Sequence, residues 1–361
     1  MLDGLKIVEI EGLGPAPFAG MMLADLGADV IVIHRKAHKG QVTAEASLLD
    51  RGKRSIVLNL KDSSDLDLAQ EIIARADGLI EGFRPGVMER LGLGPQNLHA
   101  ANPKLVYGRM TGWGQTGPRA RQSGHDLNYI ATSGALHYAG LPQDVPVTPA
   151  TLMGDIGGGA MYLVAGMLAG LLKAQRTGKG CVVDAAIVDG SAHMMALLMA
   201  IGQTGNLSET RGASLLDGPH WSRCYRCADG GYMSVQALEP QFYAELLARL
   251  ELGNDPRFIA QHDRDLWGEA NAALEQIFAA HSRDHWTALF GGSEACVAPV
   301  LSPHQSAADP HMAARGVWRD AHGALQPAPA PRFGGQPRQI NPPARRDAHR
   351  RSILRELDLP I

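Results

Sequence analysis

The sequence predicts an α/β fold built on a parallel, doubly wound sheet. Short runs rich in β-branched residues alternate with helical patterns through the first half of the chain. The first such unit, from Leu5 to Ile33, is about 30 residues long, the size of one strand–helix–strand unit. Strands that alternate with helices in this way pair in parallel and carry helices on both faces of the sheet.

The first half of the chain supplies most of the predicted sheet. A strand from Leu5 to Ile10 precedes a helix from Phe18 to Leu26, and Gly27 is the residue type that commonly ends a helix. Hydrophobic periodicity and turn residues then predict further strands and one more helix. The strands are Ala28–Ile33, Ser55–Leu60, Gly78–Glu81 and Leu105–Met110, and the helix is Leu66–Arg75.

The second half begins with the longest predicted helix, Gly157–Gln175, and a buried strand, Cys181–Val188. Asp189 suits an N-cap, so we expect a helix from there to about Ile201. Residues 202–222 lose periodicity, which is typical of a long connection between domains.

A second unit is expected from about Arg223 onward. It starts with a hairpin, Cys224–Ala237, that turns at Asp229-Gly230-Gly231. Helices, an extended return across the surface and a last helix follow. The helices start near Gln241, Asp265 and Arg283, the return is Gln326–Pro343, and the last helix is Asp347–Leu357.

The composition is that of an ordinary globular protein. Of 361 residues, 45% are hydrophobic and 20% charged, and the net charge of −3 favours neither a nucleic-acid nor a membrane partner. The longest apolar stretch, Ala160–Leu172, is shorter than the roughly 20 residues that a membrane-spanning helix needs. With no basic start of a signal peptide and only four cysteines, we expect a cytoplasmic protein.

Two local motifs resemble a dinucleotide-binding loop and half of a zinc site, but both lack groups that such sites need. Gly12-Leu13-Gly14-Pro15 follows the first strand as a dinucleotide-binding loop does, but Pro15 and Pro17 lack the N–H groups that a pyrophosphate needs. Cys224 and Cys227 have no second pair at the spacing of a structural zinc site. We therefore expect no metal site.

Basic residues near the predicted strand ends suggest a polyanionic ligand. Ligands of doubly wound folds bind at the carboxyl edge of the sheet, and arginine pairs well with phosphate. The residues are Arg35, Lys53, Arg54, Lys61, Arg84 and Arg90.

Two titratable side chains lie near the starts of predicted helices. His125 stands in Gly124-His125-Asp126-Leu127-Asn128-Tyr129, and Asp155 in Gly154-Asp155-Ile156-Gly157-Gly158-Gly159. Free backbone N–H groups at a helix start favour developing negative charge. A histidine and a carboxylate presented in this way could flank one small substrate.

Together these stretches resemble the family III CoA transferases, in particular their α-methylacyl-CoA racemase branch. His125 with Glu239-Pro240-Gln241 indicates that branch. The similarity runs from Leu5 to about Tyr243 and more weakly to Phe333. Besides the His125 and Asp155 segments, its motifs are Leu26-Gly27-Ala28-Asp29-Val30, Glu81-Gly82-Phe83-Arg84-Pro85-Gly86-Val87, Arg109-Met110-Thr111-Gly112-Trp113-Gly114-Gln115-Thr116-Gly117-Pro118, Val183-Asp184-Ala185-Ala186, Asp229-Gly230-Gly231-Tyr232 and Glu239-Pro240-Gln241-Phe242-Tyr243.

The resemblance implies a Rossmann-like large domain formed by both chain ends, a smaller α+β domain and an interlocked homodimer. The expected boundaries are 1–201 and 326–361 for the large domain, 202–222 for a connection and 223–325 for the small domain. CoA would lie on the large domain, and the partner's small domain would complete the acyl site. The matching CoA-binding positions are Arg35, Leu58, Asn59, Leu60, Lys61, Gly82, Phe83, Arg84, Arg90, Gly124, Leu127, Asn128 and Tyr129.

The resemblance also implies the chemistry. A racemase of lipid and fatty acid metabolism inverts the α-carbon of a 2-methylacyl-CoA thioester through an enolate. His125, facing the hydrogen of the S form, and Asp155, facing that of the R form, would be the two acid–base groups. Glu239 would orient His125, and the Asp126 N–H would stabilise the enolate oxygen. The glycines after Asp155 would let the acyl chain pass close to the backbone, and CoA, as part of the substrate, would be the only cofactor-like group.

Two alternatives stay open. In the transferases of this family, the aspartate that matches Asp155 is a nucleophile that carries covalent intermediates. The chain could therefore move CoA between carboxylic acids. A CoA-binding protein without catalysis is disfavoured by the presence of His125, Asp155 and Glu239 together.

Overall fold

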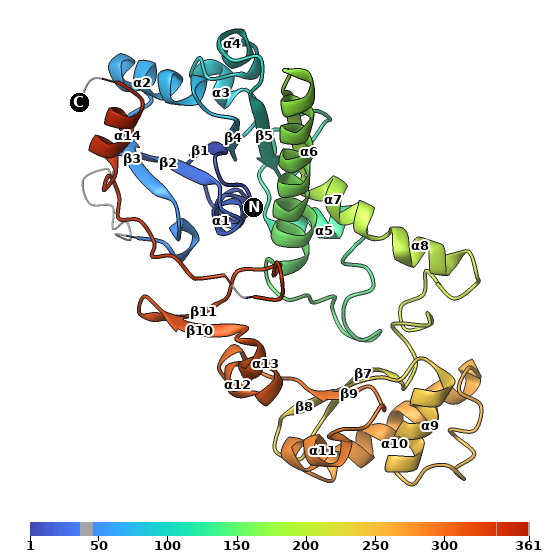
Figure 1. The fold of residues 1–361 in the computed structure, drawn as a ribbon. Coiled ribbons are helices and arrows are strands. Elements are labelled where there is room, and N and C mark those ends of the chain that lie inside the picture. The colour runs from blue at the N-terminus through green and yellow to red at the C-terminus, as the bar shows by residue number, and fades with distance from the viewer. Residues whose placement is uncertain (37–45, 337, 360–361) are drawn as a thin grey trace. The chain divides into compact units, whose positions relative to one another are not determined.

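The computed structural model describes residues 1–36, 46–336 and 338–359. The chain forms two compact units, which are described separately (Figure 1). Unit 1 comprises Met1–Ala135, Pro149–Met194 and Pro310–Ile361, and unit 2 comprises Leu136–Thr148 and Met195–Asp309.

These divisions differ from the expected domain boundaries in three segments. Residues 136–148 belong to unit 2 because Arg211 donates hydrogen bonds to the carbonyls of Ala139, Leu141 and Asp144. Residues 195–201 also count with unit 2. Residues 310–325 belong to unit 1. They include most of a hairpin over residues 318–327, and Arg51 donates hydrogen bonds to the Gln326 side chain and the Pro327 carbonyl of this hairpin.

Unit 1 is built on a six-stranded parallel sheet with the order β3-β2-β1-β4-β5-β6. This is the doubly wound order, in which the chain builds outward in both directions from a central pair of strands. The predicted α/β class with a parallel sheet is confirmed. The strands are β1 (Lys6–Ile10), β2 (Asp29–Arg35), β3 (Arg54–Leu58), β4 (Gly78–Glu81), β5 (Val106–Thr111) and β6 (Cys181–Ala186).

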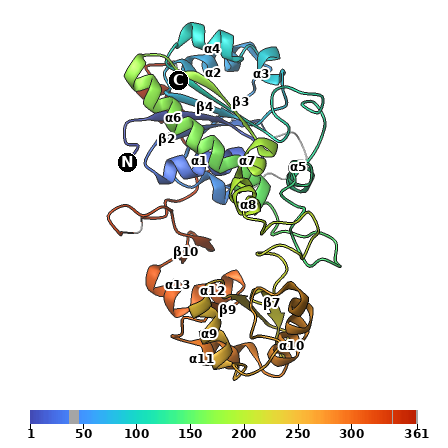
Figure 2. The ribbon, with the colours of Figure 1, turned by 90° about the vertical axis from the view of Figure 1, so that its right-hand side faces the viewer.

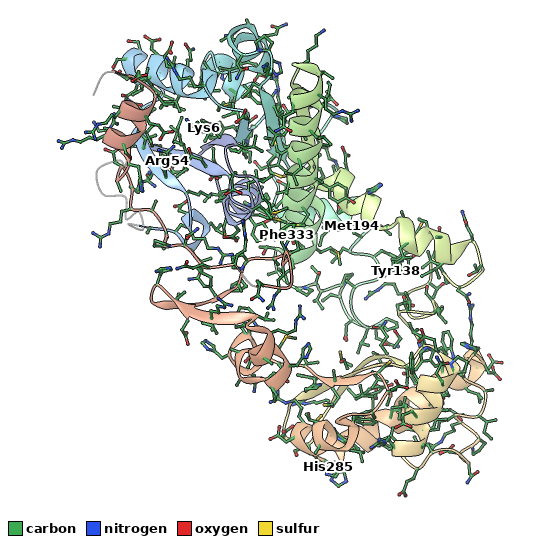
Figure 3. All side chains as sticks on the ribbon, viewed as in Figure 1. Lys6, Arg54, Tyr138, Met194, His285 and Phe333 are labelled. Atoms are coloured by element: carbon green, nitrogen blue, oxygen red, sulfur yellow. The ribbon has the colours of Figure 1, made fainter. Side chains whose placement is uncertain are left out.

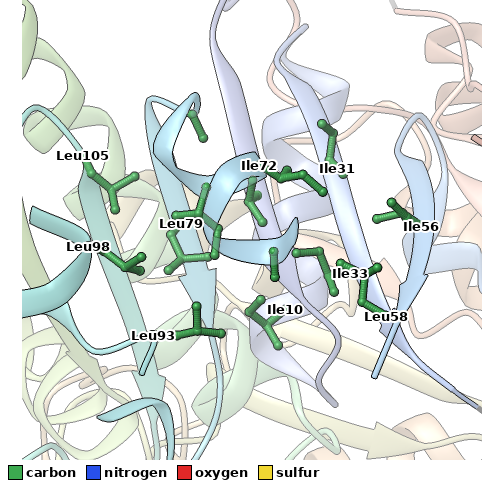
Figure 4. Close-up of a cluster of buried hydrophobic side chains, with 14 of the residues drawn as sticks. Ile10, Ile31, Ile33, Ile56, Leu58, Ile72, Leu79, Leu93, Leu98 and Leu105 are labelled. Atoms are coloured by element: carbon green, nitrogen blue, oxygen red, sulfur yellow. The ribbon is translucent and has the colours of Figure 1, made fainter. Parts of the chain in front are cut away.

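Helices cover both faces of the sheet, because alternate residues of each strand point to opposite sides. Ile10 and Leu79 belong to the core under α2, α3, α4 and α14 (Figure 4), and these first three helices group on one side of the strands in Figure 2. Ile7 and Ile80 belong to the other core, under α1 and α6. The helices of unit 1 are α1 (Pro15–Asp25), α2 (Ser63–Ala74), α3 (Val87–Arg90), α4 (Pro95–Ala101), α5 (Asp126–Ser133), α6 (Met161–Thr177), α7 (Ile187–Met194), α13 (Pro310–Arg315) and α14 (Arg350–Glu356), with the short 3₁₀ helix η1 (Leu48–Asp50) and the π-helical η2 (Leu152–Ala160).

The C-terminal part of unit 1 adds a hairpin and the last helix. The hairpin consists of β10 (Trp318–Ala321) and β11 (Ala324–Pro327). In α14, Glu356 pairs with Lys6 at 3.0 Å and with Arg54 at 2.7 Å, two residues labelled in Figure 3. These ion pairs tie the end of the chain to the start of β1 and β3.

The helix through Leu152–Thr177 is longer than expected. It starts with η2 and continues as α6, so its 26 residues are long and apolar enough to span a membrane by length and composition. The expectation that no segment reaches that length is therefore wrong. In the structure, 44% of the most apolar part of the helix is buried, and Leu163, Val164 and Met167 lie in the core under β5 and β6.

The helix expected from Asp189 is also different. The chain passes directly from β6 into α7 at Ile187, so Asp189 lies in the first turn and is not the N-cap. A break at Met195 separates α7 from α8 (Ala196–Gly202), which belongs to unit 2.

Unit 2 is an α+β unit around an aromatic core that includes Trp221, Tyr225 and Phe278. Its antiparallel sheet has the order β7-β8-β9, and β7 and β8 form the predicted hairpin. The elements are α8, β7 (Ser222–Arg226), β8 (Tyr232–Gln236), α9 (Pro240–Arg249), η3 (Arg264–Leu266), α10 (Trp267–Ala279), α11 (Arg283–Phe290), β9 (Val297–Pro299) and α12 (Pro303–Ala308).

Candidate active site

His125 directly precedes α5 as its N-cap residue. Its backbone is extended, with φ −136° and ψ 175°, and its N–H donates to Oδ1 of Asn128 at 3.0 Å. Asn128 therefore fixes the backbone that presents the exposed imidazole, because a side chain three residues into the helix reaches back to the cap.

Asp155 lies in the first turn of η2. Its backbone N–H donates to Oδ1 of Asp126, the first residue of α5, at 2.8 Å. The N–H groups in the first turn of a helix have no partner within the helix, and here a side chain from another helix supplies one. The loop after β1 also reaches this point, since a Cβ built on Gly14 would lie 3.5 Å from Oδ2 of Asp155.

Burial and two neighbouring charges act on the pKa of Asp155. Burial raises the pKa of Asp155, the charge of Asp126 raises it further, and the charge of His125 lowers it. Asp126 is itself buried. A carboxyl group with a raised pKa can hold and release a proton nearer to neutral pH, as an acid–base catalyst must.

A cavity of about 270 Å³ adjoins His125 at the carboxyl edge of the sheet. It lies beside the loops that follow β4 and β5, where ligands of doubly wound folds bind. Several predicted site residues line it together with Trp113 and Ser123. These residues are Gly82, Phe83, Arg84, Gly124, His125 and Tyr129.

The ring of Tyr129 is clamped between two glycines. A Cβ on Gly112 would lie 1.9 Å from its Cζ, and one on Gly124 would lie 2.7 Å from its Cε1, so neither position has room for a larger residue. The hydroxyl donates to the Gly124 carbonyl, and Trp113 packs edge-on at 4.9 Å. Tyr129 thereby holds the residue just before His125.

Tyr129 also connects the cavity electrostatically to Asp155. Burial and the charge of Asp155 raise the pKa of the Tyr129 hydroxyl, and the charge of Arg84 lowers it. The ring thus lies within reach of both a cation and the candidate catalytic carboxylate.

A buried ion network supports the loop after β4. Glu81 accepts the Phe83 N–H at 2.6 Å, and Arg109 donates to Glu81 at 2.9 Å and to Glu89 at 2.8 Å. Burial raises the pKa of Glu81 to about 7 against the effects of Phe83 and Arg109. Glu81 and Arg109 were not among the predicted site residues; the sequence signal for this network is two charged residues inside buried strand patterns.

The remaining predicted CoA positions lie at the same sheet edge but outside this cavity. Arg35 ends β2 and is exposed, and its Nε lies 3.8 Å from Glu11. Leu58 is buried, with 1% of the whole residue exposed. Asn59 and Lys61 are exposed after β3, Arg90 is exposed at the end of α3, Leu127 is exposed on α5, and Leu60 is half-buried.

Two basic residues from the sequence prediction do not belong to this edge. Lys53 is buried, and its Nζ contacts Glu9 at 2.6 Å and the Pro17 carbonyl at 3.0 Å. Arg54 starts β3 and pairs with Asp29 at the start of β2, which is the opposite edge of the sheet. The prediction that they face a polyanion is wrong because both side chains form ion pairs within unit 1.

The glycines after Asp155 pack closely against α7. A Cβ on Gly158 would lie 2.7 Å from the Ser191 nitrogen, and one on Gly157 would lie 3.3 Å from Met194, which Figure 3 labels. These glycines therefore allow close packing of helices. The expectation that the acyl chain passes close to their backbone stays a prediction.

Glu239 lies in unit 2, as the exposed N-cap residue of α9, and makes no side-chain cap hydrogen bond. Its predicted hydrogen bond to His125, which lies in unit 1, stays a prediction. Within the part of the chain that the structure describes, no three His, Cys, Asp or Glu side chains are grouped to hold a metal ion.

Known proteins match this chain along nearly its whole length. A family model described as CoA-transferase family III matches residues 2–349. Alpha-methylacyl-CoA racemase of Mus musculus is 38% identical over 99% of this chain and 93% of its own length, and that of Homo sapiens is 39% identical over 91% and 86%.

Transferases and a solved structure are similar as well. Acetyl-CoA:oxalate CoA-transferase of Acetobacter aceti is 32% identical over 92% of this chain and 89% of its own. The crystal structure of a CAIB/BAIF family protein from Brucella suis has a TM-score of 0.82 and 28% identity over 99% of both chains. The resemblance drawn from the motifs is confirmed, and this chain belongs to the CoA-transferase family III.

Proposed function

We propose that this protein is a racemase that inverts the α-carbon of 2-methylacyl-CoA thioesters. The observation that supports it most is the hydrogen bond from the Asp155 N–H to Asp126, which brings the segment of Asp155 against the residue that follows His125. The 38–39% identity with two racemases agrees with this assignment.

The reaction needs one acid–base group on each face of the α-carbon. One group takes the α-hydrogen as a proton, the thioester becomes an enolate, and the other group delivers a proton to the opposite face. His125 and Asp155 fill these roles, and each positioned acid–base group contributes roughly 10²–10⁴-fold to the rate. The raised pKa of Asp155 suits a carboxyl group that must be protonated in one direction and ionised in the other.

The enolate oxygen needs a fixed donor. The N–H of Asp126 belongs to the first turn of α5, where backbone N–H groups lack intrahelical partners and the helix dipole favours an anion. A donor already in place costs no reorganisation as charge develops. We assign the oxyanion to this N–H.

CoA lies along the carboxyl edge of the sheet in this proposal. The cavity beside Arg84 and Tyr129 receives the pantetheine arm, and exposed cations contact the phosphates. These cations are Arg35, Lys61, Arg84 and Arg90.

We further propose that the active form is an interlocked homodimer in which the partner supplies Glu239 to His125. Helix α8 supports an assembly, because its sequence ALLMAIG is apolar and no residue of it is buried in the single chain. Leu197 is 71% exposed. Exposed apolar side chains on one helix favour an interface with another chain. The cytoplasmic location stays a prediction.

The decisive experiment is incubation of a 2-methylacyl-CoA in D₂O without an acceptor acid. The racemase exchanges the α-hydrogen for deuterium with inversion. CoA-transferase chemistry through Asp155 is the second candidate, because the similar Acetobacter aceti protein is named a transferase. Movement of CoA to an added carboxylate, with no exchange in its absence, favours the transferase.

A further inference from the structure

We propose that the Asp126 carboxylate is a positioning group that ties the two acid–base residues into one unit, a role that rests on the racemase function proposed above. Asp126 follows His125 in the chain, and its Oδ1 accepts the Asp155 N–H at 2.8 Å. Asp126 is thus joined to His125 through the backbone and holds the Asp155 segment through its side chain. This role is separate from that of the Asp126 N–H.

The contact is built into the fold. Asp126 is buried, and a Cβ on Gly154 would lie 2.4 Å from its Oδ1, so the carboxylate fits against η2 only because residue 154 is glycine. The first bond of η2 runs from the Ile156 N–H to the Thr151 carbonyl. The Asp155 N–H comes before that bond, so the helix itself offers it no acceptor. Asp126 supplies the acceptor.

The same carboxylate acts on Asp155 through its charge. Burial raises the pKa of Asp155, and Asp126 raises it further, while His125 opposes both. Tyr129, also on α5, is a further titratable side chain whose pKa the charge of Asp155 raises. The loop before α1 presents Gly14 to Asp155, and α7 presents Ser191 and Ile187 to the adjoining glycines, none of which carries a charge.

Two variants separate position from charge. Asp126→Asn keeps an oxygen acceptor for the Asp155 N–H but removes the negative charge, whereas Asp126→Ala removes both. Both keep the backbone N–H of residue 126. By the assignment above, Asp155 takes the hydrogen of the R substrate and His125 that of the S substrate.

In D₂O, Asp126→Ala should lower exchange of the R substrate by about 100-fold, the loss expected when a reacting group moves by about 1 Å. Exchange of the S substrate should change only a few-fold. Asp126→Asn should restore R exchange to within about tenfold of the wild type. Asn128→Ala is the matched control, because Asn128 accepts the His125 N–H. It should lower S exchange more than R exchange.

The pH dependence supplies a second readout. Asp155 accepts a proton only as a carboxylate, and loss of the neighbouring negative charge lowers its pKa. The rising limb of R exchange should therefore move to lower pH in Asp126→Asn. An NMR titration of the ¹³C-labelled Asp155 carboxyl in the unliganded protein should show the same direction, and this measurement does not depend on the racemase function.

The proposal is overturned if Asp155 titrates identically in the wild type and Asp126→Asn. It is also overturned if Asp126→Ala lowers R and S exchange equally, which is what a purely structural role does. If Asp126→Ala does not fold, Asp126→Asn and the titration decide. If the wild type exchanges neither substrate, the racemase function fails, and the titration still decides the role of Asp126.

Discussion

Replacement of Arg84 by alanine should weaken substrate binding far more than it slows the chemical step. Arg84 is exposed on the loop after β4, and its Nη2 donates to the neutral Oγ of Ser123 at 2.8 Å, so the guanidinium is held in place beside the cavity. A hydrogen bond to a charged group contributes about 1.5–3 kcal/mol. With about 1.4 kcal/mol per factor of ten, KM should rise roughly 10- to 150-fold.

The expected kinetic pattern follows from where the contact lies. A phosphate contact that does not change as the α-hydrogen is transferred is equal in the ground state and the transition state, so kcat should stay nearly unchanged. Steady-state kinetics at two salt concentrations check this, because screening should shrink the difference in KM. Ser123→Ala keeps the charge and serves as the control, with a smaller rise in KM. A tenfold fall in kcat at saturating substrate would refute the reasoning.

Three further predictions concern the supporting structure. Tyr129→Phe removes the hydroxyl that holds the Gly124 carbonyl, so exchange by His125 should fall by about tenfold; equal rates in both proteins would contradict this. His220 is buried with its pKa lowered to about 4, so protonation favours the unfolded chain. Urea titrations should show that the free energy of unfolding falls by ~3 kcal/mol between pH 6.5 and pH 4. In His220→Gln this fall should be smaller. The proposed homodimer should persist on dilution, since α8 leaves its apolar side chains unburied in the single chain; a stable active monomer in sedimentation would disprove it.

The sheet could be predicted from the sequence because each strand is a short apolar run between turn residues. All six strands of the parallel sheet overlap the predicted runs, and β4 coincides with its prediction at Gly78–Glu81. The resemblance located the candidate site, and the structure brings His125, Tyr129, Arg84 and the loop after β4 around one cavity.

Features that depend on tertiary contacts could not be predicted in this way. Lys53 and Arg54 look like surface cations in the sequence, but Glu9 and Asp29, which lie far away in the chain, neutralise them. The Asp155 N–H in η2 donates to a side chain of α5, and the glycines after it pack against α7. No periodicity within the segment encodes either partner.

Single-enantiomer exchange in D₂O, followed by NMR, tests the central claim most directly. The wild type should exchange and invert both enantiomers of a 2-methylacyl-CoA. Asp155→Asn should lose inversion but still exchange the S substrate through His125, and His125→Ala should still exchange the R substrate through Asp155. If both variants lose exchange of both enantiomers, or both keep it, His125 and Asp155 are not the two acid–base groups.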